Sequence, residues 1–138
     1  MPLAFLKMHG AGNRIVVVDQ RAQDGPPPTP EQLRRLGDEA TGPGFDQLMW
    51  VTEAGGSGLD AGYRIFNADG SEVGQCGNGV RCVAWMLARE SGERKALELE
   101  SPAGIIAARI EADGRITVSM GAPEFEPSRV PFIADSRA

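Results

Sequence analysis

The sequence predicts an α+β fold in which a mostly antiparallel sheet is wrapped around one central buried helix. Three observations predict it. Residues 80–88 are apolar on all sides apart from Arg81, as expected of a helix that its own domain encloses. Several short segments are rich in β-branched and aromatic residues, which favour strands. Eighteen glycines and ten prolines, with few aromatic residues, indicate many tight turns between those strands.

The composition sets limits on the fold and on the partners. A chain of 138 residues is long enough for one hydrophobic core but short for two complete domains. The net charge of −5 and the absence of a basic block predict no nucleic-acid partner and no anionic membrane surface. No apolar run approaches the ~18 residues of a membrane span, and the amino terminus has no signal pattern. Two cysteines without a secretory segment indicate a reducing, cytoplasmic location.

The first strand is predicted over residues 4–8 and the second over the β-branched run 15–18. Between them, the two glycines and the Asn of residues 9–13 are typical of a tight connection. Asn13 either completes this turn or presents its side-chain amide to a ligand. The spacing does not match a dinucleotide-binding fingerprint, because no third glycine follows at the right place and no helix begins there.

A proline-rich surface loop is predicted over residues 23–28, and a short helix follows it. Thr29, Pro30 and Gln32 have the pattern of a capping box with proline at the first helical position. We expect this helix to end near Ala40 and to have a structural role.

The rest of the chain predicts a glycine-rich flexible loop and five further strands. The loop is expected over residues 53–62, and the strands over residues 45–51, 63–67, 97–101, 105–111 and 115–120. Asp113 and Gly114, between the last two strands, are a typical hairpin signal. Gln47, at the mouth of one strand, is either a turn-satisfying amide or a ligand contact. Asn67 ends another strand and is close in sequence to Cys76, so we expect it beside the thiol.

Cys76 immediately precedes the central helix. Gly77, Asn78 and Gly79 leave open backbone N–H groups at the helix start, where the helix dipole favours negative charge. A thiol at this place is expected to have a pKa below the free value of about 8.5. Residue type alone favours a small buried hydrophobic side chain for Cys76, whereas the surrounding glycines and Asn favour a function.

Cys82 is predicted to be a core residue rather than the partner of Cys76. If both cysteines lie on the helix, six residues separate them by ~9 Å of rise and about 240° of rotation. That distance exceeds the ~7 Å limit for a disulfide. The two cysteines and the single His9 are also too few for a zinc site, so no metal is expected.

Four segments resemble the diaminopimelate epimerase family and occur in the family's order. They are residues 7–13, 42–47, 63–73 and 75–82. The resemblance implies a half-barrel domain of this family, with two similar domains in the whole protein and one catalytic cysteine in each. It implies that residues 1–120 form the amino-terminal domain, and that residues 121–138 are a linker toward a carboxyl-terminal domain that this chain lacks.

The resemblance also implies the activity. Members of the family interconvert LL- and meso-diaminopimelate by proton transfer at the α-carbon between two thiols, without pyridoxal phosphate or another cofactor, for lysine and peptidoglycan precursors. The implied residues are Cys76 as one catalytic thiol, Asn13, Gln47 and Asn67 as side chains that hold the amino-acid substrate, and Gly77 and Asn78 as backbone donors to its α-carboxylate. The whole protein is expected to be a homodimer, and this chain alone is expected to hold half of the site and to be inactive.

One departure from the family and two alternatives accompany this interpretation. Arg14 and Ile15 stand where the family commonly has an acidic and an aromatic residue, and we expect Arg14 to face outward. The first alternative is a proline or hydroxyproline racemase-type isomerase, although that cysteine loop usually carries a His at the position of Asn78. A phenazine-type isomerase works without the cysteine. The second alternative is a catalytically inactive fragment that binds a ligand.

Overall fold

The computed structural model describes residues 5–10, 12–23, 25–56, 58–74, 77–90 and 96–120. In this part of the chain, eight strands form one sheet and a helix packs against each of its two faces. The elements in chain order are β1 Phe5–Gly10, β2 Asn13–Asp19, α1 Pro30–Gly37, β3 Gln47–Thr52, β4 Ala61–Asn67, β5 Glu72–Val73, α2 Gly77–Glu90, β6 Ala96–Ser101, β7 Gly104–Ile110 and β8 Ile116–Met120.

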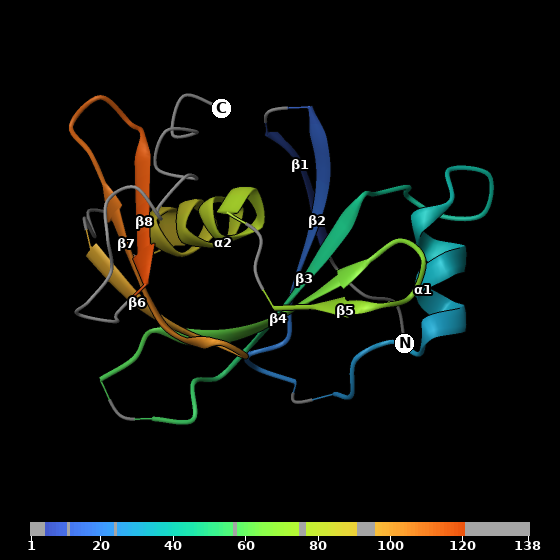
Figure 1. Cartoon of the computed structure of the whole chain (residues 1–138), viewed down its shortest axis with the longest axis horizontal. Helices are drawn as coiled ribbons and strands as arrows, with labels where there is room; N and C mark the ends of the chain where they lie inside the picture. Colours follow the sequence, from blue (N-terminus) through green and yellow to red (C-terminus); the bar gives the residue numbers. More distant parts are fainter. Residues whose placement is uncertain are drawn as a thin grey trace.

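The sheet has the strand order β1-β2-β3-β4-β6-β7-β8, with the short β5 paired to β4. The β2–β3 and β4–β6 pairs are parallel, and the other pairs are antiparallel. The sheet curls so that α2 lies inside the curve, between β1 and β2 on one side and β6, β7 and β8 on the other, whereas α1 lies outside (Figure 1). The predicted α+β fold, a mostly antiparallel sheet wrapped around a central helix, is therefore confirmed.

The two faces of the sheet carry separate hydrophobic clusters because side chains alternate along each strand. On β2, Ile15 and Val17 pack in the cluster that contains the buried residues of α2. Val16 and Val18 point the other way and pack with Leu33 of α1. Each strand residue can thus be assigned to the α2 face or the α1 face of the sheet. This assignment shows which of the candidate site residues lie together.

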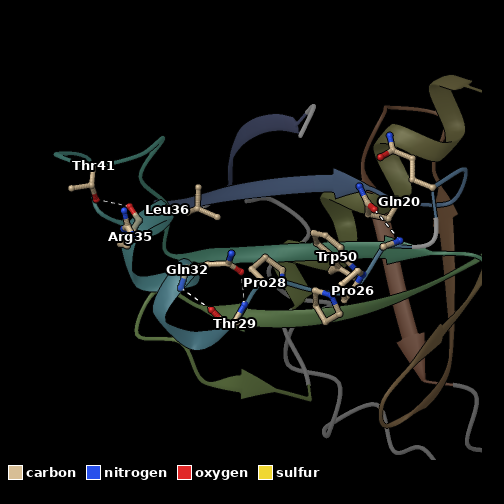
Figure 2. Close-up of a pocket in the computed structure, with 12 residues that line it drawn as sticks. Gln20, Pro26, Pro28, Thr29, Gln32, Arg35, Leu36, Thr41 and Trp50 are labelled. Carbon is tan, nitrogen blue, oxygen red and sulfur yellow. Dashed lines mark hydrogen bonds between the residues drawn. The ribbon is translucent and has the colours of Figure 1, made fainter. Parts of the chain in front are cut away.

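The capping box of α1 forms as predicted. Thr29 accepts a hydrogen bond from the Gln32 backbone N–H, and the Gln32 side chain accepts one from the Thr29 backbone N–H; Figure 2 shows both side chains. The helix ends at Gly37, before the predicted end near Ala40. The Asp38 carboxylate accepts a hydrogen bond from the Ala40 N–H at 2.9 Å, and such Asx turns compete with helix continuation.

Several strand boundaries also differ from the prediction. His9, Gly10 and Asn13 belong to β1 and β2 rather than to the turn, because Gly10 pairs with Asn13. β4 begins at Ala61, inside the segment predicted as a loop, where Gly62 pairs with Thr52 on one side and Glu100 on the other. A Cβ at Gly62 would lie 3.2 Å from Thr52 Oγ1, so the glycine permits this close approach.

Candidate functional site

Three amide side chains occupy the α2 face at one end of the sheet. Gln47 lies two residues before Met49 on β3 and so points to the same face as Met49 and Val51, which pack with α2. Asn67 is paired directly opposite Gln47 and points to that face too. Asn13 points to the same face of the sheet as Ile15, which packs with α2 and is paired with Gln47. Because residues two apart in a strand share a face, Asn13, Gln47 and Asn67 lie on one face of three adjacent strands. All three are partly exposed and so remain open to a ligand.

The Gln47 and Asn67 side chains are in contact, and the turn after β4 holds the second one. Gln47 Nε2 donates a hydrogen bond to Asn67 Oδ1 over 3.3 Å. Asn67 Nδ2 in turn donates to Ser71 Oγ over 3.1 Å, and Ser71 Oγ donates to Asp69 Oδ1 over 2.6 Å. This bond and a second one from the Ser71 N–H hold the pKa of Asp69 below its ordinary value. The charged carboxylate thereby fixes Ser71, and Ser71 fixes the orientation of the Asn67 amide.

The second part of the candidate site is the first turn of α2, which begins at Gly77 as predicted. Gly77 and Asn78 are partly exposed, so a ligand can reach the amino terminus of the helix. Cys76 and Gln75 lie outside the described residues, and the role expected of Cys76 stays a prediction. What the structure gives is the place of Cys76 in the chain, directly before the first residue of α2.

Arg81 secures the first turn of α2 to the far edge of the sheet. Its guanidinium is buried, with Nε donating to the Ile116 carbonyl of β8 over 3.0 Å and Nη1 donating to Asn78 Oδ1 over 3.4 Å. The positive charge therefore lies one turn from the helix amino terminus and adds to the potential that favours an anion there.

Two connections keep the first turn of α2 within reach of the amides. Val73 is paired with Ile65, two residues before Asn67, and the three residues between Val73 and Gly77 span at most roughly 14 Å. At the other end of the helix, Arg21, just beyond β2, donates to both carboxylate oxygens of Glu90 at 2.9 and 2.8 Å. The 14 residues of α2 rise about 21 Å, close to the length of β2. α2 is thus long enough to reach from this end of the sheet to the amide end.

His9 and Cys82 do not join the amides. His9 is paired with Arg14, and paired residues point to the same face of the sheet. Arg14 points to the same face as Val16, so both residues lie on the α1 face. Cys82 is 5% exposed and packs in the hydrophobic core with Val83 and Ala84, which confirms its predicted core position.

The α1 face carries a separate groove, shown in Figure 2, of about 940 Å³. The proline-rich loop and α1 form its walls, and the mostly buried Trp50 of β3 contributes to its floor. None of the site residues expected from the sequence lines this groove, and its cationic group is Arg35. The groove and the amide cluster are therefore different places on the molecule.

Within the described residues, no group of three or more His, Cys, Asp or Glu is arranged to hold a metal ion. Over the same residues, neither helix has the length and apolar character that crossing a membrane requires.

A curled sheet that encloses a helix is a fold that this chain shares with solved structures described as a racemase and an epimerase. The chain superposes with a TM-score of 0.65 on a probable proline racemase from Agrobacterium radiobacter, at 21% identity over 86% of this chain and 42% of that one. It superposes with a TM-score of 0.62 on a hydroxyproline epimerase from Agrobacterium vitis, at 20% identity over 84% of this chain and 40% of that one. At these identities the likeness establishes the fold alone.

Sequence comparison identifies the family among the proteins that share this fold. The family model for diaminopimelate epimerase matches residues 5–126, and the diaminopimelate epimerase of Aromatoleum aromaticum is 51% identical over the whole chain. The chain belongs to the diaminopimelate epimerase family. It spans about half the length of the curated relatives it matches.

Reasoning from the sequence missed three of the residues that support the site. Ser71 had a visible signal, because a hydroxyl four residues after a strand-ending Asn is placed to bond it across a turn. Arg81 is visible in the sequence as the one interruption of an apolar helix, but the sequence does not indicate its partners. Asp46 gave no signal, since its contacts come from residues more than 20 positions away.

Proposed function

We propose that this chain supplies the amino-terminal half of a diaminopimelate epimerase, which interconverts LL- and meso-diaminopimelate. The observation that carries the proposal is the gathering of Asn13, Gln47 and Asn67 on the face of the sheet that α2 covers. Cys76 directly precedes that helix in the chain. Membership in the diaminopimelate epimerase family supports the choice of substrate.

In this proposal the first turn of α2 binds the substrate α-carboxylate. The backbone N–H groups of Gly77 and Asn78 stand at the amino terminus of the helix, where the helix dipole places partial positive charge that favours an anion. The buried guanidinium of Arg81 adds a full positive charge one turn away. The amides of Asn13, Gln47 and Asn67 then hold the other polar groups of the substrate and fix its orientation.

The carboxylate contact also serves the chemistry. The hydrogen on the α-carbon of an amino acid is very weakly acidic, and removing it builds negative charge next to the carboxylate. Donors and positive charge that are already in place stabilise that developing charge. Inversion then needs a base on one side of the carbon and an acid on the other. On one side of the carbon, Cys76 removes the proton when it is a thiolate and returns a proton when it is a thiol. Cys76 changes between these two states with each turnover.

The second acid/base comes, in this proposal, from a second domain of the same protein. Within this chain, His9 lies on the opposite face of the sheet and Cys82 is enclosed in the core. The double length of the curated relatives supports a second domain. Residues 1–120 are then the amino-terminal domain and residues 121–138 lead to the next. The proposed enzyme uses no pyridoxal phosphate or other cofactor, forms a homodimer, and works in the cytoplasm on precursors of lysine and peptidoglycan.

The test is α-hydrogen exchange in heavy water, followed by NMR, with the complete protein to which this chain belongs. We expect LL-diaminopimelate to incorporate deuterium and to convert to the meso form, and L-proline to do neither. Cys76→Ala should abolish both reactions, whereas Cys82→Ala, the matched control, should retain them.

Residues 1–138 alone should show neither exchange nor inversion at an enzymatic rate. Turnover by residues 1–138 alone would contradict the half-site assignment. Turnover of L-proline in place of diaminopimelate would assign the chain to the racemase alternative. Binding of diaminopimelate, measured by calorimetry, without turnover by the complete protein would leave only the ligand-binding alternative.

A further inference from the structure

We propose that Arg14 and Asp46 form a clamp that sets the spacing of the three amides, so that Arg14 is a positioning residue for substrate binding. The proposal rests on the function proposed above and deepens it. Arg14 directly follows Asn13, and Asp46 directly precedes Gln47. A contact between these two residues therefore fixes two strand ends from which the amides project.

The contact between Arg14 and Asp46 consists of hydrogen bonds from both the backbone and the side chains. The Arg14 N–H donates to Asp46 Oδ2 over 2.8 Å, and the Asp46 N–H donates to the Arg14 carbonyl over 2.9 Å. Arg14 Nη2 adds a longer bond of 3.3 Å to Asp46 Oδ1. The bonds from the Arg14 backbone and guanidinium hold the pKa of Asp46 below its ordinary value, so the carboxylate is charged at neutral pH. A charged acceptor with several donors is held more firmly than a neutral one.

Asp46 also connects to the third amide. The Ala68 N–H donates to the Asp46 carbonyl over 3.2 Å, and Ala68 directly follows Asn67. The backbone of Asp46 is thus bonded to the neighbour of Asn13 on one side and to the neighbour of Asn67 on the other. Asp46 itself is the neighbour of Gln47. One residue therefore ties together the backbone positions that carry all three amides.

The clamp lies on the face of the sheet away from the proposed substrate. Arg14 points to the same face as Val16 and Val18, which pack against α1. The three amides lie on the other face, against α2. The Arg14 side chain consequently adjusts the amides through the backbone without contacting a ligand itself. This placement agrees with the expectation that Arg14 faces outward, and it gives the residue a role there.

Glu39 strengthens the clamp from the loop that follows α1. Arg14 Nη1 donates to Glu39 Oε2, so one guanidinium contacts two carboxylates of the segment 38–46. Lys7 Nζ, also on the α1 face, donates to the Pro43 carbonyl of that segment over 2.7 Å. The chain that leads into β3 is thus fastened to β1 and β2 immediately before Gln47.

The β7–β8 turn offers a matched control with the same chemistry. There the Arg115 N–H donates to Asp113 Oδ1 over 3.1 Å, and Arg115 Nε donates to Asp113 Oδ2 over 2.9 Å. Both pairs are an arginine whose backbone and side chain bond one aspartate. The control pair joins residues two apart, however, and the clamp joins residues 32 apart on two strands.

The experiment measures kcat and KM for LL-diaminopimelate in the complete protein, with Arg14→Ala, Arg14→Lys, Asp46→Asn and Arg115→Ala. Loosened amides bind ground state and transition state equally poorly, so Arg14→Ala should raise KM roughly tenfold with little change in kcat. Asp46→Asn should act in the same direction. Arg14→Lys, which keeps a cation near both carboxylates, should recover part of the loss, and Arg115→Ala should change neither constant.

Two results would overturn the clamp. One is an unchanged KM in Arg14→Ala. The other is a fall in kcat alone, in proportion to a smaller folded fraction, which would mean that Arg14 only stabilises the protein.

A second readout separates the clamp from the proposed function. If the wild-type protein does not turn over diaminopimelate, the function is wrong, and the clamp is tested by side-chain amide NMR on ¹⁵N-labelled protein. Arg14→Ala should then shift the NH₂ signals of Asn13, Gln47 and Asn67, while Arg115→Ala leaves them in place. Unshifted signals in Arg14→Ala would refute the clamp whatever the substrate.

Discussion

Gln47 and Asn67 lie directly opposite each other on β3 and β4, and Gln47 Nε2 donates a hydrogen bond to Asn67 Oδ1 over 3.3 Å. The Asn67 amide is held from its other side by Ser71 Oγ. The pair therefore presents a preorganised polar surface on the α2 face of the sheet. Such preorganisation lowers the entropic cost of binding a polar ligand.

The first prediction concerns Asn67. In the complete protein, Asn67→Ala should lower kcat/KM for LL-diaminopimelate by roughly 10- to 100-fold, the equivalent of about one to two hydrogen bonds. The melting temperature should change little, because Asn67 is partly exposed. Steady-state kinetics and calorimetry measure both effects. Gln23→Ala, an exposed amide of the loop after β2, is the control, and equal kcat/KM values for the two variants would remove Asn67 from the site.

The second prediction concerns Gly70, in the turn that supports Asn67. Gly70 has a φ of 96°, and a Cβ added there would lie 2.9 Å from the Pro30 carbonyl oxygen. Gly70→Ala should therefore destabilise the protein by about 1–3 kcal/mol, from backbone strain and from displacement of α1. Gly114 has a φ of 91°, but a Cβ there meets nothing within 4 Å.

Gly114→Ala thus carries the strain without the clash and should cost less than Gly70→Ala. Urea unfolding of both variants gives the difference. Equal losses of stability would show that α1 moves aside without cost.

The features that the sequence predicted correctly are local or depend on hydrophobic pattern. The capping box at Thr29 joins residues three apart, so three letters of sequence are sufficient to predict it. α2 is predictable because its own residues are apolar on nearly all sides, and its buried apolar residues belong to the larger core cluster. Cys82 was assigned to the core by helix geometry, and it is buried there.

The features that the sequence did not predict depend on distant residues. The start of β4 at Ala61 is set by pairing with β6, which lies nearly 40 residues later. The two residues of β5 are too few to show a strand pattern. The partnership of Arg14 with Asp46 arises only when β2 and β3 pair in parallel, and no local pattern encodes that register. Such contacts need the tertiary structure.

The third prediction concerns Arg81, the buried cation of α2. Its guanidinium donates to the Ile116 carbonyl and to Asn78 Oδ1. Arg81→Leu should lower the free energy of unfolding by about 1–3 kcal/mol, mainly because the carbonyl of the buried Ile116 of β8 loses its donor. Arg109→Leu, on the exposed side of β7, should change it by less than about 0.5 kcal/mol.

Chemical denaturation followed by circular dichroism measures both variants. If Arg81→Leu is as stable as the wild type, the bonds from Arg81 to β8 and to Asn78 contribute no net stability.

The last prediction concerns Arg21, which forms ion pairs with Asp19 at the end of β2 and with Glu90 at the carboxyl end of α2. Arg21 bonds Asp19 through Nε at 2.9 Å and Nη2 at 2.7 Å, and it also bonds Glu90. The Arg21 side chain lowers the pKa of Asp19 from its ordinary value of 3.8. A carboxylate whose pKa is lower in the folded state stabilises the fold above its unfolded pKa. That contribution is lost as the pH falls through the lowered value.

A double-mutant cycle of Asp19→Asn and Arg21→Ala should therefore give a favourable coupling energy at neutral pH that disappears in acid, below pH 3.8. Because the Asp19 side chain is 36% exposed, solvent screening limits the coupling to about 1 kcal/mol or less. Urea unfolding at a series of pH values measures it. A coupling energy that stays constant from neutral pH into acid would show that the carboxylate charge plays no part, because a protonated Asp19 cannot keep the ion pair. The disappearance in acid would instead show that the Asp19 carboxylate must be charged to hold Arg21, the residue that also bonds Glu90 at the carboxyl end of α2.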